Sequence, residues 1–251
     1  MIGFEEFGVP LDDFVPYDES VDNIRRVMTG KPFTSFAPVP VGRVCLEGLD
    51  FDELCSGAYT TSIVGDYPMQ DFSNIPKLGG ITTDYIPDQF KHIVDYVTEV
   101  EMGLRARAGN DDVLYPLWVV SSGYAPKSNR GTDDVPHFDY TANNLEGAER
   151  TQIPRVATWI VSDIRPTVCF SQEYPGIDWA GRGNRMRKRL GLDSTIRGGN
   201  KILQKHTQKH TKWPGDINQE HTLYRVQGVH ARQVATENVY RNLLAVFMTR
   251  N

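Results

Sequence analysis

The sequence has few cysteines and no long hydrophobic stretch. Its three cysteines, Cys45, Cys55 and Cys169, are widely spaced, so they offer no pair with metal-binding spacing and leave at least one thiol unpaired. A reducing compartment fits this usage best. No run of about 18 apolar residues occurs, and residues 1–6 lack the basic and apolar regions of a signal peptide. We therefore expect a cytoplasmic protein with no membrane partner.

No internal repeat or low-complexity segment is present either. The 251 residues are 39% hydrophobic and 24% charged, which is the composition of an ordinary globular protein. Chains of this length can form one large β domain, so we predict a single domain over residues 1–251. Within it we expect a helical and loop-rich support over residues 1–110 and a catalytic core over residues 111–251.

Aromatic residues are missing from the most basic part of the chain, residues 182–212. This segment holds ten Lys or Arg and one acid, whereas the whole chain has a formal charge of −5. A platform for single-stranded nucleic acid needs aromatic rings, so this composition argues against a nucleic-acid partner. The segment is either a solvated surface or a basic lid loop that attracts an anionic ligand. We predict the lid, with a small molecule as the substrate.

The hydrophobic pattern places helices early and strands late. Apolar residues at three- and four-residue steps predict a helix over residues 87–107, and a shorter helix is expected over residues 19–28. β-branched and aromatic runs then predict strands near residues 113–120, 156–161, 166–170, 222–226 and 243–248. This order is typical of an α+β fold in which helices support one face of an antiparallel barrel or sandwich.

Two possible metal ligands lie close together at His137 and Asp139. Alternate residues of a strand project from one face, so these two side chains would point the same way. Imidazole and carboxylate suit iron(II), which in a facial triad of two histidines and one carboxylate keeps open positions for a cosubstrate and oxygen. The alternative is a histidine at a strand edge beside a solvated aspartate.

A third ligand would be a histidine on a late strand. His206 and His210 fall in the basic segment, where a ligand would be poorly fixed. His221 and His230 remain, and each is followed eleven residues later by an arginine. Arg241 directly precedes the final apolar run, whereas Arg232 has no predicted strand after it. We therefore choose His230, together with Arg241.

These motifs resemble the iron(II)/2-oxoglutarate-dependent oxygenase superfamily, without indicating a subfamily. The matching pieces are Pro136–His137–Phe138–Asp139, Gly228–Val229–His230 and Arg241 before a closing strand, over roughly residues 113–248. The resemblance implies a double-stranded β-helix core, a jelly-roll or cupin-like fold buttressed by N-terminal helices. It implies iron(II) held by His137, Asp139 and His230, with no catalytic residue beyond the metal centre.

The resemblance also implies a cosubstrate site and a reaction. Arg241 would bind the distal carboxylate of 2-oxoglutarate, since guanidinium pairs with carboxylates in a bidentate manner. Tyr124 would hydrogen-bond the same cosubstrate or pack in the core, and Trp118 and Trp159 are expected in the core. The expected enzyme is a dioxygenase that uses O₂ to hydroxylate a small polar metabolite, such as an amino acid or a natural-product intermediate. The basic segment allows this metabolite to be anionic, and the co-products are succinate and CO₂.

Two other functions stay open. One is an oxygenase of nucleic acid or protein, which the basic segment motivates. The other is a non-oxidative cupin-like protein that binds zinc or manganese. Arg241 separates this last class from the oxygenases, because a protein that uses no 2-oxo acid has no need of it.

Overall fold

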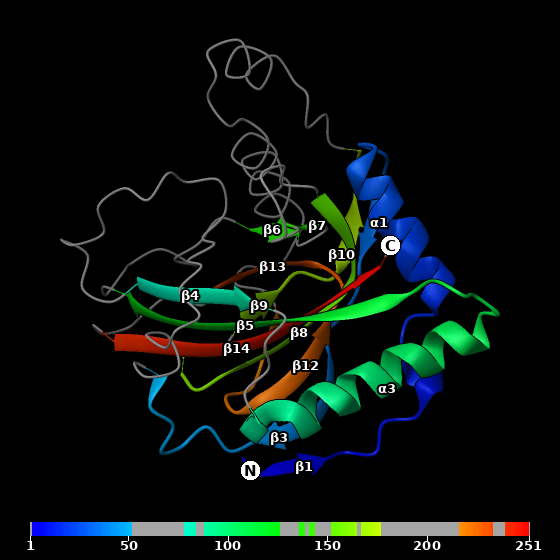
Figure 1. The fold of residues 1–251 in the computed structure, drawn as a ribbon. Helices are drawn as coiled ribbons and strands as arrows, with labels where there is room; N and C mark the ends of the chain where they lie inside the picture. The colour runs from blue at the N-terminus through cyan, green and yellow to red at the C-terminus, as the bar shows by residue number, and fades with distance from the viewer. Residues whose placement is uncertain are drawn as a thin grey trace.

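The computed structural model describes residues 2–51, 78–83, 88–125, 136–138, 141–143, 152–164, 167–176, 216–232 and 239–250. These residues form an α+β structure whose strand pairs are antiparallel, with two α-helices beside a curled sheet (Figure 1). The predicted α+β class is confirmed.

Most strands belong to one large sheet, in the order β1-β3-β12-β8-β14-β5-β4, with β7 paired to β8. Their bounds are β1 Phe4–Glu6, β3 Val39–Val44, β4 Leu78–Thr83, β5 Leu114–Ala125, β7 Thr141–Asn143, β8 Gln152–Ser162, β12 Thr222–Val226 and β14 Val239–Arg250. A small sheet has the order β11-β9-β13-β6, with β6 His137–Phe138, β9 Thr167–Cys169, β11 Asp216–Ile217 and β13 Val229–Arg232. A further pair joins β2 (Phe33–Ser35) to β10 (Gln172–Tyr174).

The strand pairs of the two sheets are nested. β5 pairs with β14, β6 with β13, β8 with β12 and β9 with β11, so the first half of this region runs beside the second half in reverse order. The chain therefore follows a long antiparallel ribbon with strands in both sheets. Two further pairs, β14 with β8 and β13 with β9, connect different parts of this ribbon.

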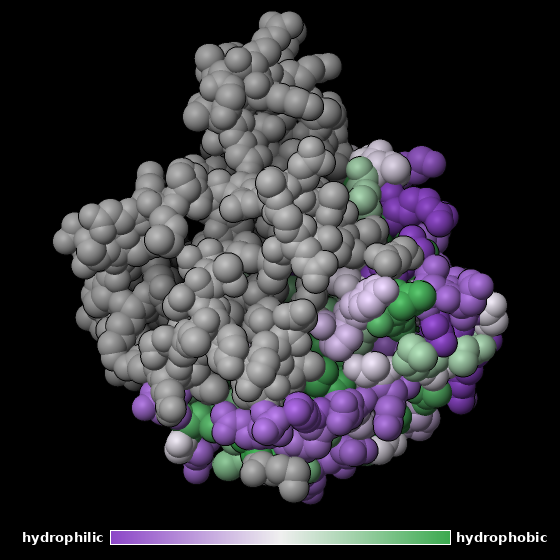
Figure 2. All heavy atoms as spheres, in the orientation of Figure 1, coloured by the Kyte–Doolittle hydropathy of each residue, from purple (hydrophilic) through white to green (hydrophobic). Residues whose placement is uncertain are grey.

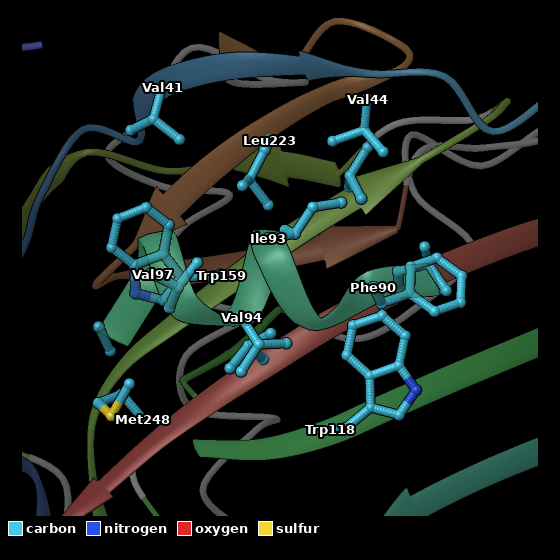
Figure 3. Close-up of a cluster of buried hydrophobic side chains, with 14 of the residues drawn as sticks. Val41, Val44, Phe90, Ile93, Val94, Val97, Trp118, Trp159, Leu223 and Met248 are labelled. Carbon is cyan, nitrogen blue, oxygen red and sulfur yellow. The ribbon is translucent and has the colours of Figure 1, made fainter. Parts of the chain in front are cut away.

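Helix α3 (Lys91–Arg107) follows a 3-10 turn η3 (Asp88–Phe90) and lies across the large sheet (Figures 1 and 3). Ile93, Val94 and Val97 pack with Trp118 and Trp159, as Figure 3 shows. Burying such a side chain contributes on the order of 1.5–3 kcal/mol. The predicted apolar stripe is confirmed, and both tryptophans lie in the core as expected.

Helix α1 (Tyr17–Met28) covers parts of both sheets and begins two residues before the predicted helix. Tyr17 and Val21 join the core cluster under α3, while Ile24 and Val27 pack with small-sheet residues. The charged residues of the helix lie on its outer side. Because its buried residues pack in both clusters, the helix fixes the small sheet relative to the large one.

The N-terminal part contributes more β structure than the sequence suggests, because β1, β3 and β4 extend the large sheet at both edges. The prediction of a helical and loop-rich region is incomplete here. Pro40 of β3 pairs with Tyr224 where the register shifts, so a residue without an N–H is accommodated at an irregularity of the ladder.

The late strands agree with the expected ones and are mostly longer. β12 has the predicted bounds, whereas β14 and β8 extend beyond the predicted runs. β5 continues to Ala125, beyond the strand predicted near residues 113–120, so Tyr124 lies in this strand. The predicted single domain stays a prediction.

Asp112 joins α1 to the last strand. Tyr17 donates a hydrogen bond to Asp112 Oδ2 over 2.8 Å, and Arg250 Nη1 lies 2.9 Å from the same oxygen. Partial burial raises the pKa of Asp112, but the hydrogen bonds from Tyr17 and Arg250 and the charge of Arg250 lower it more, so the pKa lies below its ordinary value. Asp112 therefore stabilises the fold above its unfolded pKa of about 4, and this contribution is lost as pH falls through the folded pKa.

We expect Asp112→Asn to be less stable than the parent at about pH 7 and to lose less stability than the parent between about pH 5 and pH 2, because the titrating group is gone. Urea unfolding at a series of pH values measures this. Equal pH dependence in the two proteins would contradict the assignment.

In the view of Figure 2, most of the described surface is hydrophilic, with small hydrophobic patches. No helix among the described residues is long and apolar enough to cross a membrane.

Candidate metal centre

His137 and His230 lie directly opposite each other on neighbouring strands of the small sheet. They are register partners in the antiparallel pair of β6 and β13. Directly opposed residues share one face, with Cβ atoms roughly 4.5–5.5 Å apart. The structure thus brings together two residues that are 93 positions apart in the sequence.

The flanking residues show which face this is. Phe138, Val229 and Ala231 are buried in a cluster with Ile24 and Val27 of α1. Alternate residues of a strand lie on opposite faces, so His137 and His230 are placed on the face away from α1. That face looks toward the large sheet.

Cys169 confirms the direction of this face. It is the register partner of His230 on the other side, in β9. Cys169 is buried and clusters with Tyr224 and Ala245 of the large sheet, and its Sγ lies 3.7 Å from Asn218 Oδ1. Sequence reasoning treated Cys169 only as a widely spaced thiol, because its position beside His230 depends on strand register.

The hydrogen bond of His230 favours one tautomer of its ring. The imidazole is 6% exposed, and its Nδ1 lies 2.9 Å from the carbonyl oxygen of Gly228. A carbonyl oxygen can only accept, so Nδ1 carries the proton in this hydrogen bond. Nε2 is then the nitrogen with the lone pair in the neutral ring, which is the arrangement usual for a histidine that binds a metal.

Arg241 is the third residue of β14, whereas the sequence placed it just before the final strand. Leu244, Val246 and Met248 of β14 face α3, while Ala245, with Leu243 and Phe247, packs on the inner side with Cys169. By strand alternation Arg241 has a register position on this inner face. The strand start is fixed by Asn242, whose backbone N–H and side-chain amide donate to Asp163 over 2.9 and 2.7 Å.

Tyr124 lies on the other face of the large sheet. It pairs with Tyr240, and by alternation it shares the face of Trp118, which packs against α3. Tyr124 and Arg241 are thus on opposite faces. The side chain of Tyr124 lies outside the described residues, so its cosubstrate role and its packing role both stay predictions.

His221 is separated from His137 and lies outside the small sheet. It stands in the turn before β12 with a positive φ of 57°, its N–H donates to Ser162 O, and its carbonyl accepts from Val44 N–H. The side chain lines a surface pocket with Arg43 and Cys45. His230, and not His221, is thus the register partner of His137, while the choice of metal ligand stays a prediction.

Several predicted features lie outside the described residues. These are Asp139, the side chains of His137, Tyr124 and Arg241, His206 and His210, and the lid over residues 182–212. Among the side chains that the structure does describe, no group of three His, Cys, Asp or Glu could hold a metal ion. The complete predicted triad is not within that set.

Sequence reasoning missed a buried ion pair between α3 and the large sheet. Arg225 Nε donates to Glu101 Oε1 over 2.7 Å, and both side chains are almost fully buried. Trp159 Nε1 donates to the same oxygen over 2.9 Å. A signal existed, because Glu101 interrupts the apolar stripe of α3, but its partner is 124 residues away.

Comparison of the chain with protein-family models, with curated proteins and with solved structures finds no match in any of the three.

Proposed function

We propose that the chain is an iron(II)- and 2-oxoglutarate-dependent oxygenase that hydroxylates a small polar metabolite. The observation that carries this proposal is the register pairing of His137 with His230 on the inner face of the small sheet. A facial triad needs two histidines and one carboxylate on one side of the metal. The motif His137-x-Asp139 supplies the carboxylate two positions after the first of them.

The strand pairing supports a double-stranded β-helix core for this site. A jelly roll is a long antiparallel ribbon rolled into two facing sheets, so its strands pair first with last and inward from there. The nested pairs from β5·β14 to β9·β11 follow this rule, and the histidine strands β6 and β13 form the second nested pair. The two sheets then enclose the face that carries His230.

The residues present fit iron(II). His230 directs its protonated Nδ1 to a carbonyl and keeps Nε2 as the donor nitrogen, and His137 and Asp139 would complete a set of two imidazoles and one carboxylate. Bound iron(II), with 2-oxoglutarate and O₂, supplies the oxidising power and yields succinate and CO₂. The chain's own residues would bind and orient the metal, because His137, Asp139 and His230 would hold it by one face.

Arg241 would hold the cosubstrate. Its register position is on the inner face of β14, the face on which Ala245 packs with Cys169. Cys169 belongs to β9, the strand that pairs with the strand of His230. A guanidinium stays charged at any relevant pH and pairs with a carboxylate through two parallel hydrogen bonds.

We expect Arg241→Ala to raise the KM for 2-oxoglutarate by about 10–100-fold. A hydrogen bond to a charged group contributes about 1.5–3 kcal/mol, and losing it weakens binding by about that factor. Arg241→Lys should recover part of this loss, since lysine keeps the charge without the planar fork. Steady-state succinate formation measures both variants. An unchanged KM in Arg241→Ala would remove Arg241 from the cosubstrate site.

The function is tested by following 2-oxoglutarate turnover to succinate with iron(II) and air, across a panel of amino acids, other polar metabolites, peptides and oligonucleotides. The proposal expects turnover that a small metabolite stimulates and that a chelator stops. Stimulation by oligonucleotides or peptides only would favour the macromolecular oxygenases. Tight metal binding without any turnover would favour the non-oxidative cupin-like protein.

A further inference from the structure

The turn between β12 and β13 contacts the proposed metal ligand His230 through a backbone carbonyl group. Gln227 and Gly228 connect the two strands, and Gly228 O accepts the Nδ1–H of His230 over 2.9 Å. The position of this carbonyl therefore sets the tautomer and the ring orientation of His230.

Gln227 is fixed by a chain of buried hydrogen bonds. Its side-chain Oε1 accepts from Arg225 Nη1 over 2.6 Å, and its Nε2 donates to Val156 O over 2.7 Å. Arg225 is in turn held by Glu101 of α3. The side chain of Gln227, at 5% exposure, thus has both of its polar ends satisfied on rigid elements.

Ser35 holds the other side of the same turn. Its Oγ accepts the backbone N–H of Val229 over 2.7 Å, and the neighbouring Phe36 N–H donates to Gln227 O over 3.2 Å. Ser35 is buried and comes from β2, almost two hundred residues before His230. Two hydrogen bonds therefore join the N-terminal segment to the residues on either side of Gly228.

Ser35 and Phe36 lie so close to Gly228 that they leave no room for a side chain there. A Cβ there would lie 2.4 Å from Ser35 Oγ and 2.9 Å from Phe36 O. Both distances are far shorter than an ordinary van der Waals contact. Glycine is thus required here by close approach, and any larger residue must move either the Ser35 segment or the Gly228 carbonyl.

We propose that Ser35, Gln227 and Gly228 are positioning residues for His230, which they hold with Nδ1 protonated and Nε2 presented as the metal donor. The identity of the metal in this inference rests on the proposed function. The tautomer rests on the hydrogen bonds alone. Losing an outer hydrogen-bond partner of a metal-binding histidine typically weakens metal binding by about 10–100-fold. The variants Ser35→Ala and Gly228→Ala each disturb the turn without touching the imidazole.

The test is nitrogen NMR of the His230 ring in the metal-free protein, with an iron(II) titration as a second measurement. The parent is expected to show the Nδ1–H tautomer. Ser35→Ala and Gly228→Ala are expected to show a mixture of tautomers and about tenfold weaker iron(II) binding.

Two matched controls separate positioning from general destabilisation. Ser20→Ala removes an equally buried serine hydroxyl, which donates to Pro16 O over 3.1 Å at the start of α1. Gly42→Ala introduces a comparable clash, because its Cβ would lie 2.5 Å from Phe4 and 2.7 Å from Glu5 O in β1. Both controls should keep the parental tautomer and the parental iron affinity, even where they lower stability.

A parent protein with the Nε2–H tautomer overturns the inference without any variant, and so do Ser35→Ala and Gly228→Ala variants that both keep the parental tautomer. The ring signal is read without metal, so it is independent of the proposed function. A parent with the Nδ1–H tautomer that binds no metal refutes the oxygenase, while a changed tautomer in the two variants still supports the positioning of His230.

Discussion

We expect His230→Ala to lose iron(II) binding and iron-dependent succinate formation. Removing a ligand should cost more than the roughly 10–100-fold that losing an outer partner costs. The physical reason is the geometry of the small sheet, where His230 is opposite His137 and its Nδ1 is bonded to Gly228 O. Isothermal titration of the metal-free protein with iron(II) under anaerobic conditions measures the loss.

His221→Gly is the matched control for this prediction. His221 was the competing ligand in the sequence, and its φ of 57° is one that glycine adopts without strain. The control should bind iron(II) like the parent. Loss of binding in His221→Gly together with retention in His230→Ala would overturn the choice of ligand.

A large loss of stability is expected from Glu101→Ala. The substitution leaves Arg225 buried at 2% exposure without its carboxylate, and removes the acceptor of Trp159 Nε1–H. Breaking a buried ion pair from one side typically costs about 3–5 kcal/mol, because an uncompensated charge is left in the interior. Denaturant unfolding followed by tryptophan fluorescence measures the free energy.

The comparison for this prediction is Asp22→Ala in α1. Asp22 accepts from Arg26 Nε over 2.6 Å, a geometry as good as that of Glu101 with Arg225, but both side chains are about half exposed. Solvent screens such a pair, so little stability should be lost. Equal losses in the two variants would mean that burial does not govern the Glu101 pair.

Much of the secondary structure follows from the sequence because local patterns decide it. The stripe from Ile93 to Leu104 predicts α3, and the run at residues 222–226 predicts β12 with its observed bounds. The start of β14 was missed because Arg241 and Asn242 separate Val239 and Tyr240 from the apolar run that marks the rest of that strand. β4 was missed because Gly79 and Gly80 weaken any strand pattern.

The site itself is only partly predictable from the sequence. The residue types and their order suggested His137 and His230, but their pairing depends on which strands meet and in which register. A shift of one residue would place His230 on the face toward α1. The same limit applies to Cys169 beside His230, to Ser35 beside Gly228 and to the face on which Tyr124 lies.

The most direct measurement of the central claim is the anaerobic visible spectrum of the protein with iron(II) and 2-oxoglutarate. A 2-oxo acid chelated to iron(II) gives a charge-transfer absorption that neither component shows alone, and this signal needs no substrate. We predict that the absorption forms in the parent and in His221→Gly, and is absent in His230→Ala. Its absence in the parent, or its persistence in His230→Ala, would contradict an iron centre held by His137, Asp139 and His230.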